Sequence, residues 1–476
     1  MGELESKHNL AEPDRPPLKN QEIIDTHESS YGITTEFVTA NTTRGTAYIE
    51  RDATPKDAQS IKADNFDAAI EISKELAREI QTTNKLPIKR DYHNFTGHFE
   101  PVGTMFEETV DGARKLGAEI TDEERAVGII SAFFHDRFQN GVLSHLETDA
   151  NDGGRAMLVK EDALKPGELA SVWPAWTRFR GMSTKDFSPT PGNLDETKLA
   201  EMEALKIRPN EGYTAEWIKN LLRRFKKSDG KNLFTEYSIN KVVDCVVGAT
   251  LPGFAKKKIS PEYKKKYAAA FEAAGIPQEI LDGECIEISQ VGVTNKSQIS
   301  ARIMSSVDLR GSFGTDRVSD FQELGDAEFR ETNPGIVLAI NAIKINNLRA
   351  AEVGYIAKRT IGWMKDQIGH ALTQYIIENE INESSGDSPG LRNYLLTQNG
   401  VRSKKEGREP NFIRDMRNTT TRFKRMQADY GHLQDLATFK NFTDKTQARE
   451  EDIEQLMKLL TNVGFKFDDV RTSAAA

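Results

Sequence analysis

Apolar residues recur three or four positions apart along most of the chain, which is the spacing that one face of an α-helix produces. One short strand is predicted over the sequence GTAYIER, residues 45–51. Helices are predicted over residues 65–86, 102–116, 121–134, 232–249, 296–311 and 333–380, with two or three more beyond residue 390. The pattern therefore predicts an all-α protein.

The segment TDEERAVGIISAFFHD, residues 121–136, is the most informative of these helices. Thr121 and Glu124 have the spacing of a capping box, which predicts the helix start. From Val127 onwards the helix has no polar face, and such a helix is normally buried. It ends in His135 and Asp136, and burying that pair without partners would cost several kcal/mol per ion. The sequence therefore calls for a compensating charge, and a metal cation is the obvious candidate.

Composition predicts how the rest of the chain is organised. With 37% hydrophobic and 29% charged residues, the 476-residue chain indicates a folded core with long polar segments. Residues 1–60 contain few large apolar residues, which predicts a mobile N-terminal arm. Five prolines break the pattern at about residues 160–230, which predicts an insertion carrying three of the four tryptophans.

Charge and cysteine usage restrict the classes of function. A net charge of −9 argues against a dedicated nucleic-acid binder, although basic runs such as residues 223–227 leave a local basic surface open. The two cysteines lack metal-type spacing and fit a reducing compartment. No signal peptide or membrane-spanning segment is expected, so we predict a cytoplasmic protein without a membrane partner.

Four of the eight histidines precede or closely follow the buried helix. Histidine is both a common metal ligand and the readiest general acid or base near neutral pH. The informative feature is the order: a Tyr-His-Asn sequence at residues 92–94, a further histidine at position 98, the His-Asp pair, and a distant aspartate on a later helix.

This order resembles that of the HD superfamily of metal-dependent phosphohydrolases. The Tyr-His-Asn opening is similar to a pattern in cyclic-nucleotide phosphodiesterases, and other short sequences are similar to a group of bacterial HD proteins. These sequences are NDGGRA at 151–156, GATLPGF at 248–254, SSVDLRG at 305–311, FRETNPG at 329–335 and GWMKDQI at 362–368. The resemblance implies an HD-domain helical bundle over residues 61–380, interrupted by the insertion, and a C-terminal helical extension over residues 381–476.

The resemblance also implies the chemistry. The implied ligands of a divalent metal ion (Mn, Fe, Mg, Zn or Ni) are His98, His135, Asp136 and Asp308. A metal-activated water would then attack a phosphomonoester or phosphodiester, expected to be that of a nucleotide. His93 would protonate the leaving oxygen with Asn94 orienting it, so that His93, Asn94 and Asp136 form the implied catalytic set.

Two departures from the family pattern leave alternatives open. His93 and His98 are five residues apart rather than four, with Gly97 as the extra residue, so either histidine remains a candidate ligand. Asp308 follows Asp136 by 172 residues, and its assignment depends on the flanking sequence matches. A metal-containing regulatory protein without turnover, or a nucleic-acid-linked binding protein, is the alternative function. The sequence indicates no oligomeric state.

Overall fold

Helices dominate the part of the chain that the structure describes, as the apolar spacing predicts. The computed structural model describes residues 19–42, 45–55, 57–82, 92–137, 209–250, 252–290, 298–310, 320–332, 348, 350–384, 409–436 and 446–466. Among these residues, no helix combines the length and the apolar composition that crossing a bilayer requires. Cys245 and Cys285 are both free thiols.

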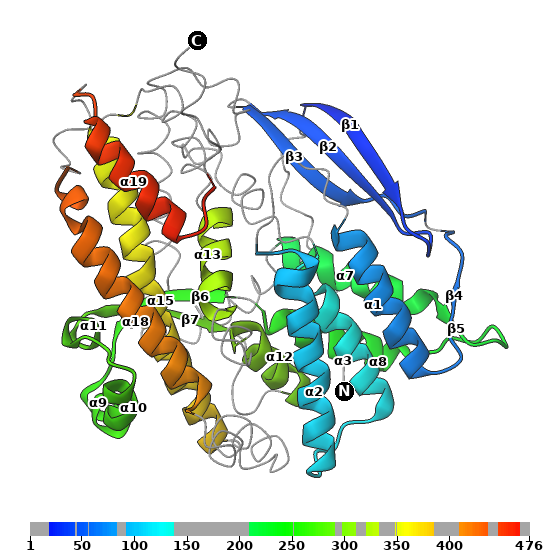
Figure 1. Ribbon diagram of the computed structural model, residues 1–476. Coiled ribbons are helices and arrows are strands. Elements are labelled where there is room, and N and C mark those ends of the chain that lie inside the picture. The colour runs from blue at the N-terminus through cyan, green and yellow to red at the C-terminus, as the bar shows by residue number, and fades with distance from the viewer. Residues whose placement is uncertain are drawn as a thin grey trace, which may run out of the picture.

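A first hydrophobic core is built around helix α3 (Asp122–Phe134), on which every residue from Ala126 to Phe134 is buried. The neighbouring helices pack with it as a bundle, drawn on the right of Figure 1. They are α1 (Phe66–Thr82), α2 (Glu100–Lys115), α7 (Pro209–Arg224), α8 (Glu236–Gly248) and α12 (Ile299–Arg310). The prediction that residues 121–134 form a central buried helix is confirmed.

A second core gathers most of the remaining helices around the long helix α15 (Ala350–Ser384). Its other helices are α9 (Pro261–Lys266), α10 (Ala268–Ala273), α11 (Gln278–Asp282), α13 (Asp320–Thr332), α18 (Asn411–Tyr430), η5 (Gly431–Leu436) and α19 (Glu450–Asn462). The predicted division near residue 380 thus falls within α15, whose apolar residues share a core with those of α18 and α19.

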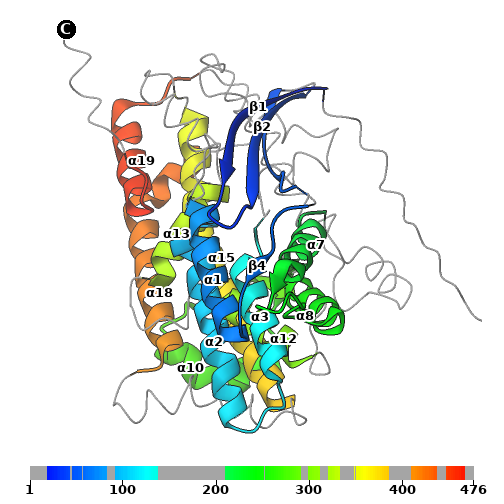
Figure 2. The ribbon, with the colours of Figure 1, turned by 90° about the vertical axis from the view of Figure 1, so that its right-hand side faces the viewer.

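Small sheets account for the strands that the structure describes. Strands β1 (Lys19–Glu28), β2 (Thr34–Thr42) and β3 (Gly45–Asp52) form an antiparallel sheet at one end of the first bundle (Figures 1 and 2). Strands β4 (Ile61–Lys62) and β5 (Phe225–Lys226) pair in parallel, and β6 (Pro252–Lys258) and β7 (Glu284–Gln290) pair in antiparallel.

The N-terminal sheet corrects the prediction of an arm over residues 1–60. β3 confirms the strand predicted from GTAYIER, but β1 and β2 were not anticipated. Composition missed them because a sheet ladder is held by backbone hydrogen bonds, which side-chain hydropathy does not report. Ile33 and Phe37, each about 2% exposed or less, are its clearest buried apolar residues. Residues 1–18 lie outside the described part of the chain.

Helix α7 similarly shortens the predicted insertion at residues 160–230. Its Trp217 is 5% exposed and meets the ring of Phe134 edge-on, with centroids 5.1 Å apart, so this end of the segment belongs to the first core. The prolines of the segment obscured the helical pattern in the sequence. The apolar residues of α7 also find packing partners on α3, which is distant along the chain. The other two tryptophans of the segment, Trp173 and Trp176, lie outside the described residues.

Candidate metal centre

Three separate elements bring four potential metal ligands together. His98 comes from the π-helix η1 (Phe95–Phe99), His135 and Asp136 directly follow α3, and Asp308 lies on α12. One donor atom from each residue lies within 4.8 Å of those of the others. The structure therefore assembles the predicted set, including Asp308 from the distant helix.

The spacing of the donor atoms suits a single ion. The Nε2 atom of His98 lies 3.1 Å from Nε2 of His135 and 3.1 Å from Oδ2 of Asp136. Oδ1 of Asp308 lies 3.5 Å from His98 Nε2 and 3.4 Å from His135 Nε2. Ligands bound at about 2.0–2.2 Å around one ion are separated by roughly 3.0–3.5 Å, which matches these distances. Two imidazoles and two carboxylates suit a divalent transition ion or Mg²⁺.

His135 is oriented by the helix that precedes it. The ring is fully buried, and its Nδ1 lies 2.7 Å from the carbonyl oxygen of Ala132. Because a carbonyl only accepts hydrogen bonds, Nδ1 carries the proton in the neutral ring and donates it. Nε2 is then left with a free lone pair directed at the cluster, which is the arrangement typical of metal-bound histidines.

The pKa shifts of His135 and Asp136 indicate that the cluster attracts a positive charge. Burial opposes protonation of His135, but the Asp136 and Asp308 carboxylates outweigh it and raise the pKa of His135 to about 10. Burial also opposes ionisation of Asp136, yet His135 and His98 hold the pKa of Asp136 well below its usual range. Burial opposes ionisation of Asp308 too, but its hydrogen bonds with His135 and His98 lower the pKa of Asp308. The two carboxylates therefore stay ionised and attract either a proton or a metal ion to the same position.

The π-helical turn of η1 accommodates the extra residue between His93 and His98. In this turn the amide of Phe99 bonds back five residues to the carbonyl of Asn94, at 3.3 Å. The Asn94 side chain caps the turn by accepting from the backbone N–H of Gly97 at 2.8 Å and from Thr96 Oγ1 at 3.1 Å. Short π-helical turns of this kind are frequent at functional sites. The predicted role of Asn94 in orienting His93 remains a prediction.

Of the two candidate histidines, His98 belongs to the cluster and His93 lies just outside it. His93 Nε2 is 3.9 Å from Oδ2 of Asp136, whereas His98 Nε2 is 3.1 Å from the same atom. The Tyr92 ring contacts both histidines, with ring centroids 4.8 Å from His93 and 4.6 Å from His98. This geometry favours His98 as the ligand and leaves His93 within reach of a molecule bound at the centre.

Two buried residues that support the His-Asp turn were not identified from the sequence. Arg137 is 1% exposed; it donates from Nη2 to Thr35 Oγ1 of β2 at 3.0 Å, and its guanidinium lies 5.8 Å from the Trp217 ring. Gln81, at the end of α1, donates from Nε2 to the carbonyl of Phe133 at 3.2 Å. The only sequence signal for Arg137 is its position directly after an apolar helix and the His-Asp pair. The only sequence signal for Gln81 is its position at the end of an apolar stripe.

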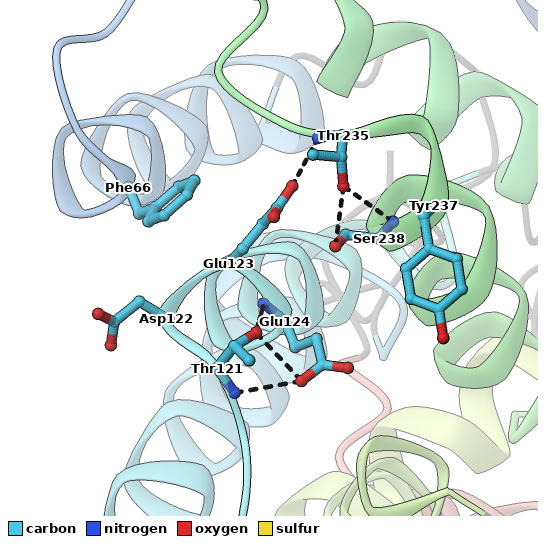
Figure 3. Close-up of a pocket in the computed structure, with 8 residues that line it drawn as sticks. All are labelled: Phe66, Thr121, Asp122, Glu123, Glu124, Thr235, Tyr237 and Ser238. Carbon is cyan, nitrogen blue, oxygen red and sulfur yellow. Dashed lines mark hydrogen bonds between the residues drawn. The ribbon is translucent and has the colours of Figure 1, made fainter.

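A surface depression of about 430 Å³ lies at the opposite end of α3 (Figure 3). There Thr121 and Glu124 form the predicted capping box, and Glu123 accepts from the backbone N–H of Thr235 at 2.5 Å. A 13-residue helix is about 20 Å long, so this depression is remote from His135. Its acidic side chains serve helix starts, and we assign it no part in the chemistry of the cluster.

The two arginines of the basic run at residues 223–227 contact other parts of the fold. Arg223 forms an ion pair with Glu236 at 2.9 Å. Arg224 donates to two backbone carbonyls of the N-terminal segment, each at 2.8 Å. Both arginines of the run therefore make contacts within the fold.

Comparison with known proteins assigns the chain to no family. No protein-family model, curated protein or solved structure matches the chain. The chain is a mostly helical protein with a buried cluster of two histidines and two aspartates that can hold a metal ion.

Proposed function

We propose that the chain is a metal-dependent phosphohydrolase of the HD type. The observation that carries this proposal is the convergence of His98, the pair His135–Asp136 and Asp308. These residues stand in the chain order that the sequence resemblance implies, and they come from three elements that have no local reason to meet. The donor distances and the orientation of His135 support a role as ligands.

The reaction follows from the residues around the cluster. His98, His135, Asp136 and Asp308 would hold a divalent ion, which would supply a water nucleophile near neutral pH and a positive charge for the phosphoryl oxygens. His93, whose Nε2 lies 3.9 Å from Asp136 Oδ2, would donate a proton to the leaving oxygen. The buried position of His98 and His135 restricts bulk water, which strengthens each charge interaction in the site.

The substrate class proposed is a phosphomonoester or phosphodiester of a nucleotide. This substrate class rests on the sequence resemblance alone. The fold does not identify the substrate, because one fold can carry unrelated activities. A protein that keeps the metal without turnover remains the second outcome of the experiment below.

Metal content is the first measurement, with wild type and Asp136→Ala compared by elemental analysis. Asp122→Ala is the matched control, since this exposed carboxylate lies at the other end of the same helix. We expect near-stoichiometric metal in wild type and control and none in Asp136→Ala. Because Mg²⁺ is easily lost, wild type without metal is retested by thermal shift with added divalent ions.

A panel of nucleotide phosphate esters then tests turnover with the identified ion restored. Hydrolysis by wild type that is lost in Asp136→Ala supports the enzyme. Stoichiometric metal with no hydrolysis of any ester supports the binding protein instead. If no ion stabilises wild type more than Asp136→Ala, the metal centre itself is refuted.

A further inference from the structure

The last turn of α3 ends with its free carbonyls individually satisfied. Helix ends leave backbone carbonyls without partners inside the helix. Here Ala132 O accepts from His135 Nδ1, Phe133 O from Gln81 Nε2, and Phe134 O from the backbone N–H of Arg137. Two of these donors come from the turn itself, whereas Gln81 reaches across from α1.

Gln81 is a polar residue at a buried position of α1. It is 8% exposed, and among the described residues its Oε1 is buried with no hydrogen-bond partner. A buried amide with one unsatisfied end does little for stability, and an apolar side chain of the same volume would suit the position as well. Its one side-chain hydrogen bond to a described residue is the contact to the Phe133 carbonyl, and this contact is where we look for the role of the amide.

The orientation of the Phe133 carbonyl affects the metal ligands directly. The peptide unit that contains this oxygen leads into Phe134 and then into His135 and Asp136. Ala132 O, which orients the His135 ring, belongs to the preceding peptide unit. A rotation of the Phe133 peptide would therefore displace the imidazole and the carboxylate together.

We propose that Gln81 is a positioning residue of the metal centre, holding the last turn of α3 so that His135 and Asp136 meet His98 and Asp308. This inference rests on the proposed metal-binding function and adds a residue that neither touches the ion nor belongs to the family pattern. Contacts that orient metal ligands typically change affinity about 10–100-fold when removed.

The test compares Gln81→Met with wild type by calorimetric titration of the metal-free proteins with Mn²⁺. Methionine keeps the volume of the side chain and removes the donor. The matched control is Ser73→Ala, which removes from the same helix a buried hydroxyl that has no hydrogen-bond partner among the described residues. We expect Gln81→Met to bind Mn²⁺ at least about tenfold more weakly and Ser73→Ala to match wild type.

A spectroscopic readout separates positioning from general destabilisation. The visible spectrum of bound Co²⁺ reports ligand geometry, and we expect it to change in Gln81→Met. The melting temperature of the metal-free variant should stay within about 2 °C of wild type. If Gln81→Met fails to fold, Gln81→Leu, which also lacks a hydrogen-bond donor, provides the same comparison.

The outcomes distinguish this inference from the proposed function. Mn²⁺ binding by Gln81→Met within twofold of wild type, with an unchanged Co²⁺ spectrum, overturns the role of Gln81 and leaves the metal centre intact. A wild type that binds no divalent ion overturns both. If neither Gln81 variant folds, Gln81 is a structural residue and the positioning role is rejected.

Discussion

The ring nitrogen Nδ1 of His135 lies 2.7 Å from the carbonyl oxygen of Ala132, three residues earlier in the chain. His135 thereby satisfies a carbonyl at the end of α3 and directs its other nitrogen at the cluster. One side chain thus ends a buried helix and offers a metal ligand. The cost of burying a carbonyl without a partner and the need for a fixed tautomer are resolved by the same hydrogen bond.

Asp308→Asn tests whether the most distant residue of the cluster is a ligand. The amide keeps the volume of the carboxylate but removes its charge, so we expect at least about a 100-fold loss of Mn²⁺ affinity, more than contacts behind a ligand usually cost. Titration calorimetry of the metal-free proteins measures the change.

Asp326→Asn is the control for Asp308→Asn, because Asp326 is a buried carboxylate on α13 paired with Arg422 at 2.7 Å. This variant should lose stability and keep the metal. Unchanged affinity in Asp308→Asn would remove Asp308 from the ligand set.

His93→Gln distinguishes a proton donor from a ligand. His93 lies 3.9 Å from Asp136 and outside the four-residue cluster, so we expect the variant to retain metal and to lose about 10²–10⁴-fold in turnover. Metal content and steady-state kinetics on a cleaved phosphate ester provide the two readouts. Loss of the metal from His93→Gln would instead make His93 a ligand.

The parts of the site that sequence reasoning predicted depend on local patterns. Thr121 and Glu124 form the expected capping box, and the run from Ala126 to Phe134 is buried as its apolar character requires. The helical spacing around Asp308 also places that residue on a helix, as predicted. Such features need only neighbouring residues, which is why a single sequence displays them.

The parts that were missed depend on contacts between distant segments. Gln81 meets Phe133 across 52 residues, and Arg137 meets Thr35 across 102. The residues of β1 and β2 lack a strong hydrophobic alternation and pair through their backbones. The π-helical turn at Phe95–Phe99 is a local feature, but its five-residue spacing left the choice between His93 and His98 open until both rings could be placed.

Gly103→Ala tests the close packing of α2 on α3. A Cβ atom at position 103 would lie 2.6 Å from the ring of Phe133, so the ring or the helix must move. We expect a loss of about 1–3 kcal/mol in the free energy of unfolding, measured by urea denaturation. Because Phe133 lies in the last turn of α3, metal affinity should fall as well.

Gly362→Ala is the matched control for this packing effect. Position 362 lies within α15, and no atom of the described neighbouring residues lies within 4 Å of an added Cβ. Alanine there should raise stability by up to about 1 kcal/mol through helix propensity. Equal effects of the two substitutions would contradict the close approach of α2 and α3.

His370 on α15 makes stability depend on pH in the second core. Its Nδ1 is buried without a hydrogen-bond partner among the described residues, and burial lowers the pKa of His370 to about 4. In the unfolded chain a histidine titrates near pH 6.5. Between these values the unfolded chain binds a proton that the folded chain does not, so stability is fully present above about pH 6.5 and falls as the pH decreases toward 4.

His370→Leu should remove this part of the pH dependence. Between pH 7.5 and pH 5.0 the wild type should lose about 2 kcal/mol more than the variant in urea unfolding, as the two pKa values require. Carboxylates that titrate in this range are common to both proteins and cancel in the comparison. A His370→Leu profile as steep as that of wild type would show that His370 is protonated in the folded protein at pH 5, and that the buried ring has found a partner for the added charge.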